Sequence, residues 1–386
     1  MDGDAQQDRD GAAANGADGA AAEGADGAAA EGVNGTPVNG SATDGTDTDG
    51  AAASGVPAAA GPVAAATAPV APPAPVVPPA VPWRAVVVFV VLAIGLAWAA
   101  CSPMWISGEG LQDPRFSLWT IVMMYTPTVA ALVTVFLVHR PRSVPRLLGL
   151  WPLRPWGRTI GFCLLALFGL CALPLLAILL GGALGLVQLD LQNLSGMAQS
   201  PILQSAQDVP LQVVLIISIV ALPVNSLVSA LATLGEEIGW RGWLLPNLRP
   251  LGTWPALLLS GVIWGVWHAP LILLGYNFGY TDLRGVGLMI IFCVFVGILL
   301  GWLRLRTATV WPCVLGHAAI NSASSVSLML LSASELKDVQ TLGMGSFLGI
   351  PGWILMAAVI VVLVLTRQFR KQVRAGVPTK AGVSGQ

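Results

Sequence analysis

Two glutamates and two histidines stand inside long apolar stretches of this 386-residue chain: Glu236, Glu237, His268 and His317. An ionisable side chain at membrane depth costs about 3 kcal/mol or more, so one that is retained there usually has a function. A carboxylate and an imidazole can together take a proton from water and deliver it to a leaving group. These four residues therefore indicate hydrolytic chemistry as the first hypothesis.

The two glutamates are adjacent, yet they are expected to have different roles. Glu237 precedes Arg241 by four residues, which is the favourable order and spacing for an ion pair on a helix. Because neighbouring helical residues point about 100° apart, Glu236 must face another direction, where no local partner is evident. We expect Glu237 and Arg241 to hold the helix and Glu236 to be a general base. The alternative, that both acids only neutralise Arg241, stays open.

Each histidine has a neighbour at helical spacing. Trp264 precedes His268 by four residues and can pack against its ring, and Pro270 can open the helix just beyond. His317 and Asn321 are also four residues apart, so they present an imidazole and a carboxamide on one helix face. The structural alternatives are a histidine satisfied by a backbone carbonyl and an interhelical hydrogen-bonding pair.

The composition excludes a water-soluble protein. The chain is 55% hydrophobic and 10% charged, with a mean hydropathy of +0.74, whereas soluble domains are about 25% charged. The net charge of −1 gives no field that would attract nucleic acid. The five cysteines contain no CxxC pair, so they predict neither a disulfide framework nor a thiolate metal site.

The apolar segments predict an all-α, polytopic membrane protein with about eight transmembrane helices. The third and fourth segments are longer than a simple crossing and are expected to tilt, kink or re-enter. With the N-terminus inside, fifteen of the 19 Lys and Arg residues lie on the inner side and three on the outer side, which predicts that both termini are cytoplasmic. The expected spans are 85–101, 118–138, 159–187, 211–245, 254–274, 286–303, 309–331 and 351–366.

The regions outside the helical domain have their own composition. Residues 1–55 are rich in Gly, Ala and Asp and predict a disordered tail, and residues 56–84 are rich in Pro and Ala and predict a semi-rigid spacer. Residues 85–370 form the predicted eight-helix domain, and residues 371–386 a cytoplasmic C-terminal tail.

Three of the candidate residues are expected at similar depth in the bilayer. At 1.5 Å per helical residue, Glu236, His268 and His317 lie roughly 12 to 21 Å from the predicted cytoplasmic ends of their spans. One acid, two imidazoles and an amide on three helices therefore favour a hydrolytic site reached from the cytoplasmic face.

Together the three passages resemble the CPBP family of intramembrane proteases, also called the Abi or type II CAAX prenyl endopeptidase family. Each motif alone is short, whereas all three in this order on an eight-helix protein are specific. The second motif departs from the usual FxxxH, since a tryptophan replaces the phenylalanine. The resemblance covers about residues 85–370 and rests on EExxxR (Glu236, Glu237, Arg241), WxxxH (Trp264, His268) and HxxxN (His317, Asn321).

This resemblance implies a peptidase that cleaves a membrane-associated protein or peptide near the cytoplasmic face. Glu236 and His268 would activate water, and His317 and Asn321 would donate hydrogen bonds to the oxyanion. The sequence has no HExxH. Glu236, His268 and His317 are compatible either with Zn²⁺ or with metal-free activation of water. Whether the substrate is prenylated stays open.

Two other classes of function remain as alternatives. Glu and His at membrane depth also build the proton relays of coupled transporters, although no convincing inverted repeat of the GEEIGWRG passage is evident. A non-enzymatic membrane scaffold or immunity protein could also retain the same fold as a binding surface.

Overall fold

The computed structural model describes residues 78–141, 143–153, 155–199 and 209–370, which are helical throughout apart from turns and one isolated bridge between Leu189 and Leu331. The predicted tail 1–55, most of the spacer 56–84 and the tail 371–386 lie outside these residues. The all-α class expected from the sequence is confirmed.

The helices in chain order are α1 (Trp83–Ile106), α2 (Phe116–Val133), α3 (Val144–Leu148), α4 (Trp156–Leu165), α5 (Cys171–Ala183), α6 (Ser195–Ala198), α8 (Leu211–Val220), α9 (Leu222–Glu237), α10 (Leu245–Leu248), α11 (Thr253–Trp267), α12 (Ala269–Ile272), α13 (Leu283–Thr307), α14 (Trp311–Ser327), α15 (Val339–Gly345) and α16 (Ile350–Leu365).

Six helical segments of the described chain are long and apolar enough to cross a bilayer. A seventh is added if the bent pair Leu211–Val220 and Leu222–Leu251 is counted as one span. With six or seven such segments, the protein is an integral, multi-pass membrane protein. The expected count of eight is not confirmed, because α11 has only 15 residues and is too short for a simple crossing of about 30 Å. The six are Trp83–Ile106, Phe116–Val138, Trp156–Ala183, Leu283–Thr307, Trp311–Leu330 and Val339–Leu365.

The fourth predicted span is bent by 56° between α8 and α9. Pro223 stands in the first turn of α9 and has no N–H group, so it cannot form the i→i−4 hydrogen bond that would continue α8. The kink that the length of this segment suggested is therefore present. Beyond Glu237 the same helix widens into a π-helical segment, Ile238–Leu244, before α10 begins.

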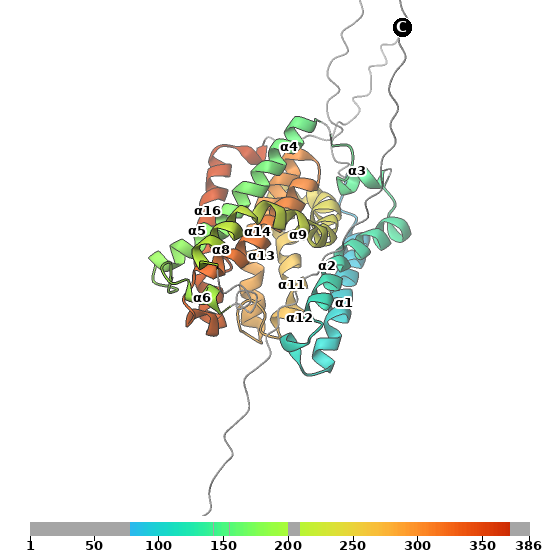
Figure 1. The fold of residues 1–386 in the computed structure, drawn as a ribbon. Coiled ribbons are helices and arrows are strands. Elements are labelled where there is room, and N and C mark those ends of the chain that lie inside the picture. Colours follow the sequence, from blue (N-terminus) through green and yellow to red (C-terminus); the bar gives the residue numbers. More distant parts are fainter. Residues whose placement is uncertain (1–77, 142, 154, 200–208, 371–386) are drawn as a thin grey trace, which may run out of the picture. The chain divides into compact units, whose positions relative to one another are not determined.

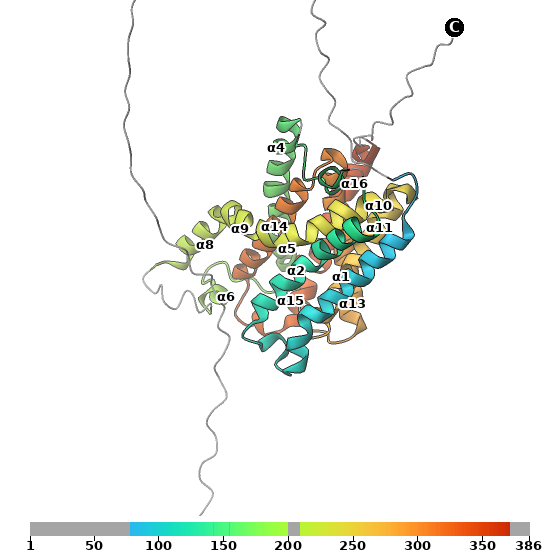
Figure 2. The same cartoon turned by 90° about the vertical axis from the view of Figure 1, so that its right-hand side faces the viewer.

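The helices that carry the candidate residues pack against one another. Figure 1 shows α9, α11, α13 and α14 near the middle of the described helices, and α11 with α13 and α9 with α14 are in direct contact. Figure 2 shows α1 and α2 side by side, and α2 also contacts α9. The site helices thus pack directly on one another and on α2, while α9 also keeps an exposed face.

Glycine makes the closest of these contacts feasible. At Gly261 and Gly265 of α11, a Cβ atom would collide with the α13 backbone, at Val294 and Ile290 respectively. Only a residue without a side chain lets two helices approach so closely. This contact fixes α11, and with it Trp264 and His268, against α13.

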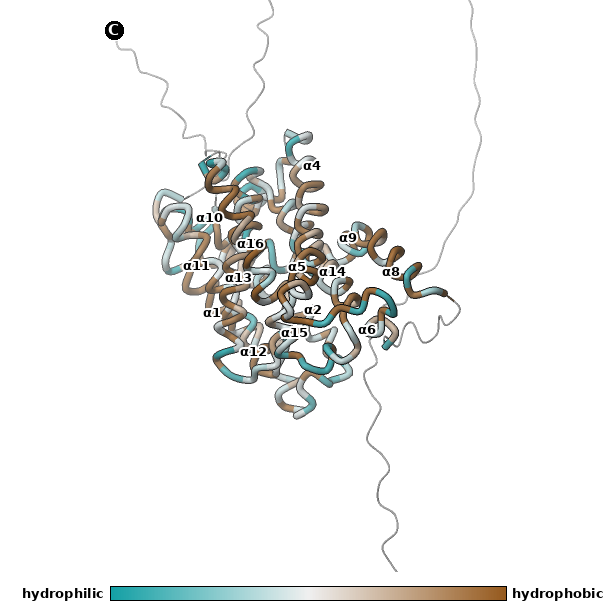
Figure 3. The backbone as a smooth tube through the Cα atoms, turned by 90° about the vertical axis from the view of Figure 1, so that its left-hand side faces the viewer, coloured by the Kyte–Doolittle hydropathy of each residue, from teal (hydrophilic) through white to brown (hydrophobic). Residues whose placement is uncertain are grey.

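The outer faces of the helices are apolar. Figure 3 shows hydrophobic colour along the helices and hydrophilic colour mainly in the connections. On α8 and α9, large apolar side chains such as Ile216, Val220, Val224 and Val228 are more than half exposed. Such surfaces suit contact with lipid chains and not with water.

Candidate active site

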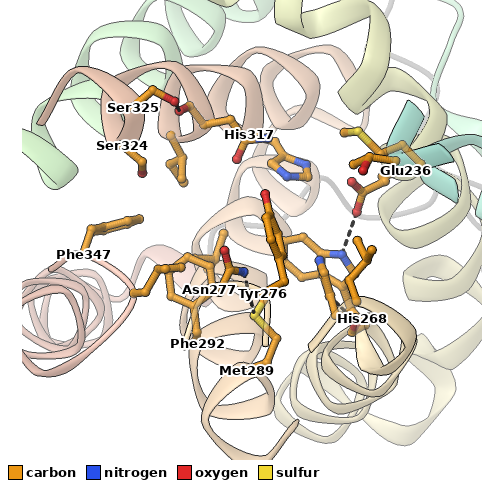
Figure 4. Close-up of a pocket in the computed structure, with 18 of the residues that line it drawn as sticks. Glu236, His268, Tyr276, Asn277, Met289, Phe292, His317, Ser324, Ser325 and Phe347 are labelled. Atoms are coloured by element: carbon orange, nitrogen blue, oxygen red, sulfur yellow. Dashed lines mark hydrogen bonds between the residues drawn. The ribbon is translucent and has the colours of Figure 1, made fainter. Parts of the chain in front are cut away.

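The candidate residues line one cavity. It has a volume of about 350 Å³ and is bordered by Glu236, His268, His317 and Asn321. Figure 4 shows Glu236 from α9, His317 from α14 and His268 from the end of α11 around the same space. Three segments far apart in sequence therefore bring an acid, two imidazoles and a carboxamide together, as the depth argument predicted.

Glu236 is buried, but it is not without a partner. Trp264 donates a hydrogen bond from Nε1 to Glu236 Oε2 over 2.8 Å, as the dashed line in Figure 4 marks. This partner comes from α11 and is not local in sequence, so the local sequence around Glu236 did not reveal it. The bond occupies one carboxylate oxygen and leaves Oε1 without a hydrogen bond from a described residue.

Glu237 and Arg241 form the ion pair that their spacing predicted. Arg241 Nη1 lies 2.6 Å from Glu237 Oε1, and both side chains are almost completely buried. The guanidinium carbon of Arg241 also lies 4.2 Å from the centre of the Trp264 ring. A cation over an indole face is favourable when it is shielded from water. Arg241 therefore connects the glutamate pair to the tryptophan that binds Glu236.

His317 contacts the same glutamate. Its Nδ1 lies 3.0 Å from Glu237 Oε1, and its ring stands edge-on to Trp264 with 5.3 Å between ring centres. Because the ion-paired carboxylate of Glu237 only accepts hydrogen bonds, Nδ1 of His317 carries the proton. The Nε2 atom is then an acceptor in the neutral ring and a donor only when the ring is doubly protonated.

His268 lies where α11 ends, two residues before Pro270. Its Nδ1 is 2.9 Å from the backbone carbonyl oxygen of Trp264. A carbonyl can only accept, so Nδ1 carries the proton and Nε2 keeps a basic lone pair. The expected packing of Trp264 on this imidazole is present, with ring centres 5.8 Å apart.

Asn321 lies one helical turn beyond His317 on α14 and borders the same cavity. Unlike His317 it is exposed, and its carboxamide makes no hydrogen bond within the described part of the chain. Its amide N–H groups are thus free to bind an oxygen atom in the cavity.

The Zn²⁺ alternative of the sequence analysis stays a prediction. Within the described residues, no three His, Cys, Asp or Glu side chains are placed so that they could hold a metal ion. This includes Glu236, His268 and His317, which the sequence suggested as ligands of Zn²⁺.

Several lining residues were missed by the sequence analysis. Tyr276 and Asn277 lie on the loop after α12, and Ser324 and Ser325 follow Asn321 on α14. The loop brings Tyr276 into the cavity wall through a backbone hydrogen bond to Leu271 of 3.2 Å and contact with Phe116. The only signal in the sequence was a short glycine-rich break, GYNFGY, which gives no direction to its side chains.

The fold and this cavity define a multi-pass helical membrane protein with a Glu/His/His/Asn site. Residues 214–323 match the family model described as type II CAAX prenyl endopeptidase Rce1-like, and all seven motif residues lie within this range. This segment is thus similar to Rce1-like proteins, which agrees with the resemblance to the CPBP family that the motifs suggested. No curated protein matches the chain by sequence.

Proposed function

We propose that this protein is an intramembrane endopeptidase that hydrolyses a peptide bond of a membrane-associated protein or peptide. The Rce1-like domain supports a CAAX-type protease family. The observation that carries the proposal further is the cavity, in which Glu236 lies beside two imidazoles that both keep Nε2 available. A site for hydrolysis needs a base, a second group that orients water and donors for the oxyanion.

Glu236 and His268 are the residues that activate water in this proposal. Glu236 Oε1 takes one proton from the water molecule, while His268 Nε2 accepts a hydrogen bond from its other O–H group. The water oxygen forms a bond to the carbonyl carbon of the substrate, whose oxygen becomes an oxyanion. Glu236 then returns the proton to the departing amine as the C–N bond breaks, so the carboxylate is regenerated.

His317 and Asn321 bind the oxyanion in this proposal. The Asn321 carboxamide donates from Nδ2, and His317 donates from Nε2 when its ring is doubly protonated. The hydrogen bond between His317 Nδ1 and Glu237 orients the ring so that Nε2 is the nitrogen left for this contact. Glu237 and Arg241 are positioning residues, because they touch His317 and Trp264 and not the substrate.

The proposed orientation follows the charge distribution, with both termini on the cytoplasmic side and the substrate reached from that side. A fluorescent or protease-sensitive reporter fused to each end would be accessible in the cytoplasm. Reporters at the two ends that lie on opposite sides of the membrane would contradict this topology.

The decisive experiment compares membrane proteomes of cells that carry wild-type protein or a variant. With Glu236→Ala, His268→Ala or His317→Ala, we expect one precursor to accumulate and its cleavage to fall at least about 100-fold. Glu109→Gln removes an exposed carboxylate outside the cavity and is the matched control. Cleavage at the wild-type rate by folded Glu236→Ala would contradict the proposed function.

A further inference from the structure

Near the end of α13, several buried side-chain nitrogens have no hydrogen-bond acceptor among the described residues, and three of them belong to Arg306 (Nε and Nη1) and Trp302 (Nε1). The two residues are four positions apart and therefore lie on one face of the helix. Buried donors in folded proteins nearly always have a partner. Their clustering indicates that an acceptor from outside the described chain binds at this face.

A second arginine completes the cluster from the neighbouring helix. The guanidinium carbons of Arg158, on α4, and Arg306, on α13, lie 5.8 and 5.6 Å from the centre of the Phe162 ring. The Phe162 ring in turn lies 5.6 Å from that of Trp302. Figure 1 shows α4 alongside the other helices, and the two helices are in contact.

The described residues offer no carboxylate that compensates the charge of this cluster. No carboxylate forms an ion pair with Arg158 or Arg306 within the described residues. Two guanidinium groups that share one aromatic ring repel each other unless an anion lies between them. Guanidinium forks match the oxygen geometry of phosphate particularly well.

The surroundings place the cluster at the level of lipid headgroups. Trp151 and Trp156, at the start of α4, are exposed and lie with their ring centres 6.1 Å apart. Exposed tryptophans of membrane proteins gather at the boundary between lipid and water. One turn and two turns farther along α4, Ile160 and Leu164 are half exposed, as on a surface that faces acyl chains.

We propose that Arg158 and Arg306 bind the phosphate group of an anionic phospholipid. Arg306 donates from Nε and Nη1, Trp302 donates from Nε1, and Arg158 supplies the second charge. The lipid then bridges α4 and α13. It stabilises α13, which is the helix against which α11 and His268 pack. The site is separate from the cavity of Glu236, since none of Arg158, Trp302 and Arg306 borders that cavity.

The test measures lipid binding to the purified full-length protein and does not depend on proteolysis. Delipidated protein in neutral detergent is titrated with phosphatidylglycerol or phosphatidylcholine, and bound lipid is counted by native mass spectrometry. Wild-type protein should prefer phosphatidylglycerol. Arg306→Gln and Arg158→Gln should each weaken phosphatidylglycerol binding about fivefold, the effect expected for one arginine near an anionic headgroup. Arg158 is only half-buried, so its substitution disturbs packing less. If Arg306→Gln does not fold, Arg158→Gln alone still tests the site.

Arg140→Gln is the matched control, since it removes the same charge from an exposed position beside a neighbouring span. If Arg140→Gln binds phosphatidylglycerol as wild type does, the result supports a defined site. If Arg140→Gln loses as much binding as Arg306→Gln, the lipid is attracted by the overall charge of the surface and the proposed site is overturned. Equal binding of the two lipids by wild-type protein would also overturn the proposed site.

Inorganic phosphate is the third probe. If millimolar phosphate displaces the lipid from wild-type protein and not from Arg306→Gln, the phosphate group itself is what the site recognises. If phosphate raises the melting temperature without lipid, and Arg306→Gln abolishes this, the anion site stands but its source is soluble.

Discussion

Glu237 Oε1 is shared by Arg241 Nη1 at 2.6 Å and His317 Nδ1 at 3.0 Å, so one carboxylate oxygen joins two helices of the site. Glu237 was expected only to hold its own helix through Arg241. Its contact with His317 gives it a second role, because it fixes which imidazole nitrogen carries the proton and which faces the cavity. The neighbouring Glu236 takes no part in this ion pair, in agreement with its proposed role as the base.

Glu237→Gln should lower both stability and cleavage. The substitution removes one charge of a buried ion pair and leaves Arg241 uncompensated, which typically costs about 3 to 5 kcal/mol. The melting temperature should fall clearly below that of wild type, and the His317 orientation should be lost with it. Thermal unfolding in detergent measures this effect, with Glu109→Gln as the control for loss of an exposed carboxylate. An unchanged melting temperature would show that the pair is not structural.

Trp264→Phe should reduce cleavage while the protein stays folded. Phenylalanine is the usual residue of the family motif and keeps an aromatic ring beside His268, but it cannot donate to Glu236 as Nε1 does. A hydrogen bond to a charged group contributes about 1.5 to 3 kcal/mol, so cleavage should slow by about tenfold or more. The rate constant for a purified substrate is the measurement. A rate equal to that of wild type would show that the indole N–H has no part in the reaction.

Removal of divalent metals should leave cleavage unchanged, because no three ligands of the described chain are placed to hold an ion. Purified protein is treated with a chelator and assayed, and its metal content is measured by mass spectrometry. Stoichiometric zinc that disappears in His317→Ala, together with activity lost on chelation and restored by zinc, would contradict this prediction.

Much of the site was predictable because its signals are local. The pairs Glu237–Arg241 and Trp264–His268 are both at i,i+4 spacing, which a helix converts directly into contact. The contacts between helices were not predictable, since Trp264 reaches Glu236 and His317 reaches Glu237 only after distant segments pack. The partner of Glu236 therefore cannot be read from the sequence.

The fold was predicted in class but not in its number of crossings. Hydropathy detects an apolar segment, yet it does not show where a helix ends or bends. The break at His268 shortens α11 to 15 residues, and Pro223 divides the fourth segment. Both irregularities lie in motif helices, where the backbone is shaped by packing around the cavity as well as by local preference.

Asp338 should stabilise the start of α15 in a pH-dependent way. Its carboxylate accepts hydrogen bonds from the Thr341 hydroxyl and from the backbone N–H groups of Gln340 and Thr341. The Thr341 hydroxyl, followed by its backbone N–H, holds the pKa of Asp338 below its usual value. A lowered pKa in the folded state means that this stabilisation is present at neutral pH and is lost as the pH falls through that pKa. The melting temperature of Asp338→Ala should therefore be lower than that of wild type at pH 7, and the difference should shrink in acid. A difference that is constant with pH would contradict the role of the charge.

Gly265→Ala should destabilise the protein, whereas Gly287→Ala should not. The Cβ atom of an alanine at position 265 would lie against the Ile290 backbone of α13, so the two helices must separate. Overpacking of this kind costs about 1 to 3 kcal/mol. Gly287 is on α13 itself and has open space at its Cβ position, so the same substitution there adds a methyl group without a collision. Because alanine favours helix more than glycine does, Gly287→Ala should be neutral or slightly stabilising. Paired thermal unfolding measurements decide the matter. If the two variants melt at the same temperature, then the close approach of α11 and α13 does not hold His268 in place.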